Sequence, residues 1–202
     1  MAKSNKLLVA ITGGIGSGKS TFAEYLSKQG YIVLSADDIS KEILAKDPDV
    51  RKEIIKEFGA ESYSGKNVKK EFLADEVFSD PTRLKKINSI LHPRVREKIK
   101  SISDEHFKTN DIIFVEAALI YESKMEKMYD YVVLIVADKD LRKKRVTSEG
   151  KISEKDFINR NEKQLDDEIK KKKADFVFMN NSFKSELKQK AALLPILLKT
   201  NR

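Results

Sequence analysis

Five short apolar runs along the chain predict the strands of a buried sheet. The runs occupy residues 7–11, 31–34, 112–115, 131–136 and 176–179. They are continuous instead of alternating, which is typical of parallel strands that are covered on both faces. Segments with helical spacing separate the runs, and strands that alternate with helices indicate an α/β fold. We therefore expect a parallel five-stranded sheet flanked by helices.

The unequal spacing of the runs predicts two insertions into this core. The long stretch between the second and third runs has little strand signal, and its helical patterns lie near 48–58, 68–77 and 81–107. Because this stretch is too long for one crossover, we expect a helical insertion at about 38–109 that folds over the carboxyl edge of the sheet. A charged helical stretch between the fourth and fifth runs has the placement of a mobile lid, at about 141–173. Residues 1–202 then form one unit, whose core is 1–37, 110–140 and 174–202.

Residues 13–21, which read GGIGSGKST, carry the strongest chemical signal. They match the pattern G-x-x-x-x-G-K-[ST] at Gly13, Gly18, Lys19 and Ser20. A predicted strand precedes the pattern, and a predicted helix at 19–29 follows it. In such a loop the backbone N–H groups turn around phosphates, and the helix N-terminus adds a positive dipole. We expect Lys19 to reach the β- and γ-phosphates of ATP and Ser20 to coordinate Mg²⁺, whereas the alternative is a glycine turn without a ligand.

Acidic residues follow the second and third runs, at the edge of the sheet where α/β proteins bind ligands. Asp37 or Asp38 is placed to accept a proton from an attacking hydroxyl group. The alternative is that Ser35 or Asp37 caps the helix that follows. Glu116 ends the third run, beside the predicted phosphate-loop strand, and is placed to hold a magnesium-bound water. An ordinary polar strand end is the alternative for Glu116.

Cations are frequent in the predicted lid and after it. Arg142, Lys144, Arg145 and Arg160 lie in this stretch, and arginines there would close over a transferring phosphoryl group. Each of them alone also fits a solvated helix face. The run of lysines at 170–173 is expected to be such a solvated face.

The overall charge and the absence of cysteine exclude several classes of protein. The chain has 40 basic and 32 acidic residues, a net charge of +8, which suits anionic partners. No aromatic residues interleave with the lysines as a stacking platform for bases requires, so no nucleic-acid partner is expected. Without cysteine there is no disulfide framework, thiolate zinc site or thiol catalysis. The two histidines lack metal-ligand spacing.

No apolar run is long enough for a membrane span, and the N-terminal run leads into a glycine loop instead of a cleavage site. We therefore expect no membrane partner and a cytoplasmic location. The pair His92-Pro93 lies within the third helical pattern of the insertion. Because proline breaks helices and restricts the residue before it, the plain interpretation of this pair is a helix boundary.

The motifs together resemble the dephospho-coenzyme A kinase family over nearly the whole chain. Residues 12–21 look like that family's version of the phosphate loop, and residues 35–37 resemble its Asp-Ala-Asp. Residues 77–81 and 91–95 are similar to its coenzyme A-binding segment, and residues 118–122 to its Pro-Leu-Leu-Phe-Glu. Arg160 and Gln164 match its Arg-x-x-x-Gln, and residues 174–181 its last strand with two asparagines.

The resemblance implies a P-loop kinase fold and transfer of the terminal phosphoryl group of ATP to the ribose 3′-hydroxyl of dephospho-coenzyme A, the final step of coenzyme A biosynthesis. It implies that Asp37, Lys19 and Arg145 are catalytic, that Asp37, His92 and Glu122 bind this substrate, and that Ser20 and Glu116 hold Mg²⁺. The set that it implies for ATP is Gly13, Gly14, Ile15, Gly16, Ser17, Gly18, Lys19, Ser20, Thr21, Arg160 and Asn180.

Several positions depart from the family pattern. Ser35 replaces its first aspartate, Ala118 its proline, and Ser182 the glycine after its asparagines. Glu149 stands where an arginine is common, four residues after Arg145, and is the departure that reverses charge. We expect Glu149 to pair with Arg145 and not to touch ATP.

Two other functions stay open at this point. A kinase of another small acceptor, such as a nucleoside monophosphate, would need an arginine clamp in the insertion, where Arg51, Arg83, Arg94 and Arg96 lie. A nucleic-acid-binding or regulatory NTPase would need a switch glycine or a nucleic-acid module, and neither is visible. We expect a monomer or a weak homo-oligomer.

Overall fold

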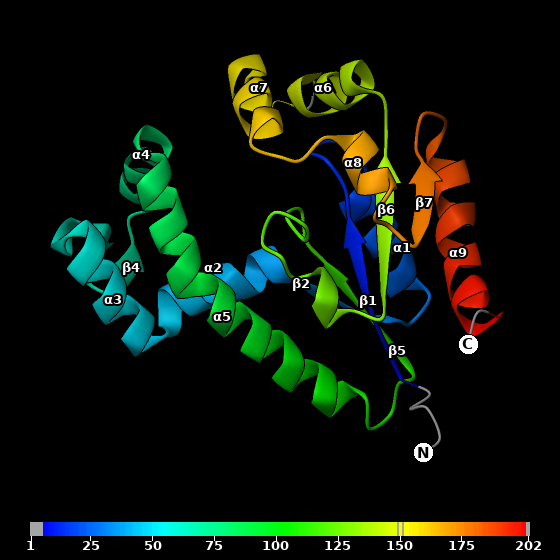
Figure 1. Cartoon of the computed structure of the whole chain (residues 1–202), viewed down its shortest axis with the longest axis horizontal. Helices are drawn as coiled ribbons and strands as arrows, with labels where there is room; N and C mark the ends of the chain where they lie inside the picture. Colours follow the sequence, from blue (N-terminus) through cyan, green and yellow to red (C-terminus); the bar gives the residue numbers. More distant parts are fainter. Residues whose placement is uncertain (1–5, 149, 151, 201–202) are drawn as a thin grey trace. The chain divides into compact units, whose positions relative to one another are not determined.

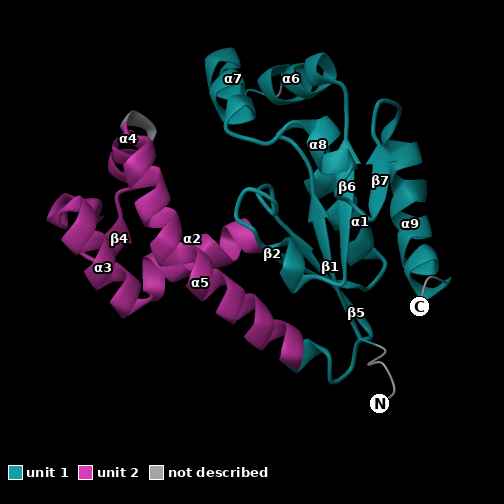
Figure 2. Cartoon of the chain, in the orientation of Figure 1, with its two compact units in different colours: residues 1–35, 105–202 teal, residues 36–104 magenta. Residues whose placement is uncertain are grey.

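The computed structural model describes residues 6–148, 150 and 152–200. Glu149 lies outside the described residues, so its expected pairing with Arg145 stays a prediction. The chain forms two compact units (Figure 2). The first comprises Met1–Ser35 with Glu105–Arg202, and the second is Ala36–Asp104.

A five-stranded parallel sheet forms the centre of the first unit, as the sequence predicts. Its strands are β1 (Leu7–Thr12), β2 (Ile32–Ser35), β5 (Ile112–Glu116), β6 (Tyr131–Val136) and β7 (Phe176–Met179). Their order is β2-β5-β1-β6-β7, and every neighbouring pair is parallel (Figure 1). The carboxyl ends of the strands therefore meet at one edge, and the loop after the central strand β1 lies in the middle of that edge.

Two helices, α1 (Lys19–Lys28) and α9 (Lys184–Thr200), cover one face of this sheet side by side (Figure 1). Alternate strand residues such as Val9 and Ile11 point toward them, and Phe22 packs on the ring of Phe178 at 5.5 Å between centroids. A left-handed glycine, Gly30, ends α1 with a φ of 90°, and its N–H bonds the carbonyl of Ser27. The buried residues of this core are Leu7, Val9, Ile11, Phe22, Ala23, Leu26, Ile112, Phe114, Val133, Ile135, Phe178, Leu187, Ala191, Leu194 and Leu198.

The stretch between β6 and β7 is divided into three short helices, α6 (Lys139–Ser148), α7 (Glu154–Glu162) and α8 (Asp167–Lys171). Side-chain caps explain two of the starts: Ser153 accepts from the N–H of Asp156 at 3.1 Å, and Asp166 from that of Glu168 at 2.7 Å. The remaining element of this unit is a short 3₁₀ turn, η2 (Glu126–Met128). That residues 141–173 act as a lid stays a prediction.

The second unit is mainly helical, with α2 (Ala36–Lys46), α3 (Pro48–Phe58), α4 (Lys70–Ser79) and most of α5 (Pro81–His106). A 3₁₀ turn, η1 (Ala60–Ser62), leads into a hairpin of β3 (Tyr63–Ser64) and β4 (Asn67–Val68). This hairpin is not predicted from the sequence, because its strands are too short to show an alternating pattern. Gly65, with a φ of 57°, supplies the left-handed residue that a tight hairpin loop favours.

The expected helix boundary at His92-Pro93 is wrong, because α5 continues through Pro93. A proline inside a helix leaves the carbonyl four residues earlier, here that of Ser89, without its N–H donor. One residue later, the Arg94 guanidinium donates to the carbonyl of Ile90 at 2.9 Å and adds a donor on this turn. The buried residues Ile90, Leu91 and Val95 flank the proline, so packing favours a continuous helix here.

Candidate functional site

The loop between β1 and α1 takes a shape that requires glycine at more than one position. Gly18 has a φ of 96° and stands directly before the first residue of α1. A Cβ atom at this position would lie 2.3 Å from Nδ2 of Asn180, which follows β7. Gly16 is also left-handed, with a φ of 76°. The loop therefore brings backbone N–H groups and the N-terminus of α1 to one place, the arrangement that binds phosphate groups.

Lys19, Ser20 and Glu116 meet where α1 begins. The hydroxyl of Ser20 donates to Oε1 of Glu116 at 2.8 Å, and Nζ of Lys19 lies 3.8 Å from the same oxygen. The side chains of Lys19 and Glu116 are 15% and 17% exposed, so the pair is largely shielded from water. The strand register explains the meeting, because Glu116 on β5 is paired with Ile11 on β1, just before the loop.

The oxygen atoms of Ser20 and Glu116 suit Mg²⁺, which takes one or two protein ligands beside phosphate oxygens and water. Among residues 6–148, 150 and 152–200, no three His, Cys, Asp or Glu side chains are grouped to hold a metal ion. A site with few protein ligands therefore fits Mg²⁺ better than it fits an ion that needs a full set of side chains.

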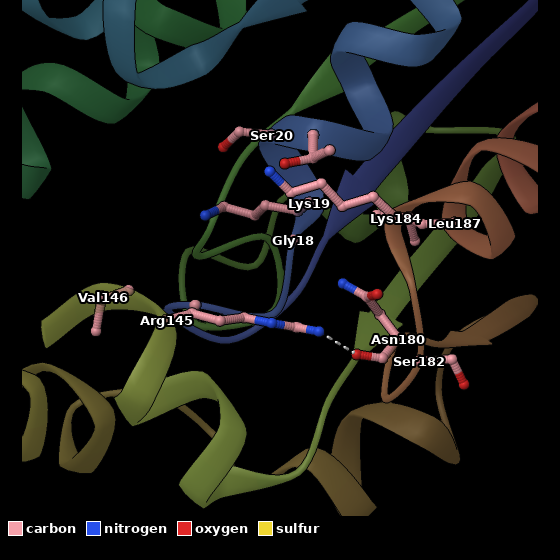
Figure 3. A pocket seen from close by; sticks show the side chains of 11 residues that line it. Gly18, Lys19, Ser20, Arg145, Val146, Asn180, Ser182, Lys184 and Leu187 are labelled. Carbon is pink, nitrogen blue, oxygen red and sulfur yellow. Dashed lines mark hydrogen bonds between the residues drawn. The ribbon is translucent and has the colours of Figure 1, made fainter. Parts of the chain in front are cut away.

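A cavity of about 340 Å³ opens beside the loop (Figure 3). Cationic side chains reach it from three helices: Lys19 of α1, Arg145 of α6 and Lys184 of α9. Among the described residues that line it, none is acidic. Its size and charge suit an anionic ligand such as a nucleotide.

Arg145 is fixed in this cavity by the residue after β7. One guanidinium nitrogen, Nη2, donates to the backbone oxygen of Asn180 at 2.9 Å (Figure 3). The other, Nη1, is buried and has no hydrogen-bond partner among the described residues. Burial lowers the pKa of Arg145, although a guanidinium stays charged. A buried, partly unpaired cation of this kind is suited to an anion that arrives with the ligand.

The side chain of Asn180 is used within the protein. Its Nδ2 donates to the backbone oxygen of Ser17 at 2.8 Å, and the residue is only 7% exposed. Asn180 therefore joins the phosphate loop to Arg145 through its amide and its carbonyl. Asn180 therefore has a structural role, and its expected contact with ATP stays a prediction.

Glu122 lies among residues from the α7–α8 region. Its Oε1 accepts from the N–H of Leu165 at 2.8 Å and lies 2.9 Å from Nζ of Lys170. Lys170 is fully buried, so the expectation of a solvated lysine face at 170–173 is wrong for this residue. Nothing in the local sequence separates Lys170 from its neighbours. That Glu122 also binds substrate stays a prediction.

The remaining expected site residues belong to the helices α7, α2 and α5. Arg160 is exposed on α7 and does not line the cavity beside the loop. Asp37 and His92 belong to the second unit, in the first turn of α2 and inside α5. Asp37 is the second residue of α2, so it is not the N-cap of this helix, which is the residue before the first helical position. Asp38 pairs with Lys41 at 2.7 Å on the surface of α2.

Three residues contact the loop or support it in ways that the sequence analysis did not foresee: Arg142, Gln164 and Asp167. Arg142 is 5% exposed and lies 3.4 Å from Oδ2 of Asp167. Gln164 accepts a hydrogen bond from the loop itself. The spacing of charges along the chain carries no signal for these contacts, because each joins residues that are far apart in sequence.

Comparisons of this chain with protein families, related sequences and solved structures agree with one another. The family model described as Dephospho-CoA kinase matches residues 7–186. A dephospho-CoA kinase of Bacteroides fragilis is 35% identical over 189 residues, 94% of this chain and 92% of that protein. A crystal structure from Thermus thermophilus has a TM-score of 0.83 at 29% identity and covers 96% of this chain and 97% of its own. The dephospho-CoA kinase from Campylobacter jejuni has a TM-score of 0.72 at 29% identity, with 96% and 98% covered.

In the described part of the chain, every helix is too short or too polar to span a membrane.

Proposed function

The chain belongs to the dephospho-CoA kinase family, and from this premise we propose that it transfers the terminal phosphoryl group of ATP to the ribose 3′-hydroxyl of dephospho-CoA. The products are CoA and ADP, and the reaction is the final step of CoA biosynthesis. The observation that carries the proposal is the cluster of Lys19, Ser20 and Glu116 at the phosphate loop of a chain that matches this family over residues 7–186.

The phosphate loop binds the phosphates of ATP in this proposal. Free backbone N–H groups of the loop and the N-terminus of α1 face the anion, and Lys19 neutralises the β- and γ-phosphates. Arg145, whose guanidinium is held by the backbone oxygen of Asn180, adds positive charge to the cavity. Arg160, which is exposed on α7, would approach the nucleotide when the lid closes.

Ser20 and Glu116 would hold Mg²⁺, Ser20 as a direct ligand and Glu116 through water. When bound, the ion supplies positive charge that stabilises the transferring phosphoryl group. Nζ of Lys19 lies 3.8 Å from the same oxygen of Glu116 and would help to hold this carboxylate in place.

Asp37 takes the proton in this proposal. The 3′-hydroxyl oxygen forms a bond to the γ-phosphorus, the bond from that phosphorus to the β-phosphate oxygen breaks, and ADP leaves. Asp37 accepts the proton of the hydroxyl group as the bond forms. His92 and Glu122 bind dephospho-CoA, as the family resemblance implies. We keep a cytoplasmic location and a monomer or weak homo-oligomer as expectations.

An assay of ADP release with a panel of acceptors tests the function. Purified protein with ATP and Mg²⁺ is expected to turn over dephospho-CoA, and omission of Mg²⁺ should abolish the signal. The product is identified by mass and by digestion as the 3′-phosphate. Turnover of nucleoside monophosphates or shikimate without turnover of dephospho-CoA would show that the assignment is wrong.

A further inference from the structure

The tip of the phosphate loop is held on both sides by residues from the segment between β6 and β7. The N–H of Ile15 donates to Oε1 of Gln164 at 3.0 Å. The backbone oxygen of Ile15 accepts from Nη1 of Arg142, a long contact of 3.4 Å. Both polar groups of this loop residue are therefore satisfied by side chains that follow it by more than a hundred positions.

The same contact explains two glycines that the general phosphate-loop pattern does not require. A Cβ atom at Gly14 would lie 2.2 Å from Nη1 of Arg142. A Cβ atom at Gly16 would lie 2.5 Å from the backbone oxygen of Arg142. Gly14 does not have a left-handed φ, so a side chain there would have to displace the guanidinium of Arg142. At Gly16 the obstacle is the backbone of α6, in addition to the left-handed φ.

Arg142 is anchored at α8 directly, and the backbone next to Gln164 is linked to α8 through Glu122. Oδ2 of Asp167, the first residue of α8, lies 3.4 Å from Nη2 of Arg142. Gln164 is followed by Leu165, whose N–H donates to Glu122, and Glu122 also pairs with Lys170 of α8. The short helix α8 therefore supports Arg142 directly and Gln164 through Glu122 and Leu165.

We propose that Arg142 and Gln164 are positioning residues, which fix the tip of the phosphate loop at Ile15 so that the N–H groups after it face the nucleotide phosphates. The proposal rests on the proposed function, because it takes the loop to be the nucleotide site. Because the N–H of Ile15 is bonded to Gln164, this N–H does not bind a phosphate oxygen of the nucleotide. A loop with four glycines in its first six residues loses much entropy on binding, and a loop that is held beforehand loses less.

Removing one hydrogen bond to the loop should weaken nucleotide binding and little else. Gln164→Met keeps the length of the side chain and removes the acceptor. We expect the dissociation constant of ADP, measured by calorimetry without acceptor substrate, to rise about five- to tenfold, the effect of one hydrogen bond. The KM for dephospho-CoA should stay within about twofold. Gln189→Met makes the same change at an exposed glutamine of α9 and should bind ADP like the wild type.

A second pair of variants tests the contact itself. Gly14→Ala should weaken ADP binding because its methyl group displaces Arg142. In an Arg142→Ala background the same methyl group meets no guanidinium, so adding Gly14→Ala should change ADP binding by less than about twofold. This pair decides the question if Gln164→Met does not fold.

The outcomes separate this proposal from the proposed function. Wild-type ADP affinity in folded Gln164→Met, or equal losses from Gly14→Ala in both backgrounds, would overturn the positioning role. An equal loss of affinity for ADP and dephospho-CoA would do the same, because it indicates a general structural defect. Failure of the wild type to phosphorylate dephospho-CoA would instead overturn the proposed function and leave the ADP comparison valid.

Discussion

Nζ of Lys170 lies 2.9 Å from Oε1 of Glu122, and the side chain of Lys170 is 0% exposed. An ammonium group without water needs an opposite charge nearby, and Glu122 supplies it. Burial raises the pKa of the neighbouring Tyr121 to about 12, with smaller effects from Asp175, Glu126 and Glu122. Tyr121 is therefore neutral at ordinary pH, and Glu122 is the charge that faces Lys170. This pair ties α8 to the segment after β5.

Loss of either charge alone should destabilise the first unit. Glu122→Gln leaves a buried ammonium without its counter-charge, and Lys170→Met leaves a carboxylate, so each should lower the free energy of unfolding by about 3–5 kcal/mol. The double variant Glu122→Gln/Lys170→Met removes both charges and should recover most of the loss. Urea unfolding followed by circular dichroism measures all four proteins. Additive losses in the double variant would contradict the pairing.

The same double variant tests whether Glu122 also binds substrate. If Glu122 acts only through Lys170 and Leu165, the KM for dephospho-CoA should return with stability. If Glu122 touches dephospho-CoA, that KM should stay high although the protein is stable again. The second result would support the substrate-binding role that the family resemblance implies.

Ser20 and Glu116 should control the requirement for magnesium. Ser20→Ala removes a proposed ligand, and Glu116→Gln removes the charge that accepts from Ser20 and faces Lys19. Each is expected to raise the Mg²⁺ concentration for half-maximal activity by about 10–100-fold. Titration of Mg²⁺ after EDTA treatment measures the change. Ser27→Ala, at an exposed serine of the same helix, is the matched control and should follow the wild type. Normal magnesium dependence in both variants would remove these residues from the metal site.

The sheet was predictable because its strands are read from local sequence. The runs at 131–136 and 176–179 match β6 and β7. The inner strand β6 is almost wholly buried, as a continuous apolar run predicts, whereas Val177 and Met179 of the edge strand β7 are exposed. The start of β2 differs from the start of its apolar run by one residue. Tyr31 belongs to its apolar run, but its N–H bonds the carbonyl of Leu26 and completes the end of α1. The strand therefore begins at Ile32.

The contacts around the loop were not predictable, because they depend on partners that only the folded chain supplies. Lys170 lies in a run of four lysines. It can be buried because its ammonium group pairs with Glu122, which lies 48 positions earlier in the sequence (170 minus 122). Gln164 was visible as part of a motif, but its partner, the N–H of Ile15, carries no sequence signal at all. Pro93 stays within a helix because tertiary packing outweighs its local preference. Roles assigned to Asp37, His92 and Arg160 stay predictions.

Asp37 and its neighbour Asp38 offer a matched comparison for the general base. Asp37→Asn keeps the shape and removes the proton acceptor, so kcat should fall by about 10²–10⁴-fold while ATP binding changes little. Asp38 pairs with Lys41 on the surface of α2, and Asp38→Asn should cost little. Steady-state kinetics with both substrates measures the difference. Equal, small losses in the two variants would show that neither residue is the base.

His92 should make stability depend on pH. Burial, and to a smaller extent Arg96, lower the pKa of His92 from its ordinary value of 6.5. The unfolded chain then binds a proton at a pH where the folded chain does not, so the free energy of unfolding should decrease as pH falls through about 6.5 toward the lower folded value. His92→Gln removes this contribution. Thermal unfolding at about pH 7.5 and pH 5.5 should show a smaller difference in this variant than in the wild type or in His106→Gln. The same slope in all three proteins would contradict the assignment to His92.

Within the predicted lid, the contacts of Arg145 fit the catalytic role that we propose for it. Its guanidinium is anchored to the carbonyl of Asn180 through Nη2, whereas Nη1 is buried in the cavity without a partner among the described residues. A cation held in this way needs no reorganisation when charge develops on a transferring phosphoryl group. Arg145→Ala should therefore lower kcat by about 10³–10⁵-fold, as expected for a charge-stabilising arginine.

Further variants test whether the loss of kcat in Arg145→Ala comes from the anchored guanidinium or only from the loss of one positive charge. Arg145→Lys keeps one positive charge but cannot both bond the Asn180 carbonyl and present a second donor in the same plane, so it should recover only part of kcat. Arg160→Ala removes an arginine that is exposed on α7 and should affect the KM for ATP more than kcat. Lys144→Ala changes an exposed cation next to Arg145 and should behave like the wild type. Kinetics of the four variants at saturating Mg²⁺ give the comparison. A large loss of kcat in Lys144→Ala together with near-normal activity in Arg145→Ala would show that the general charge of α6, and not the anchored guanidinium, supports the reaction.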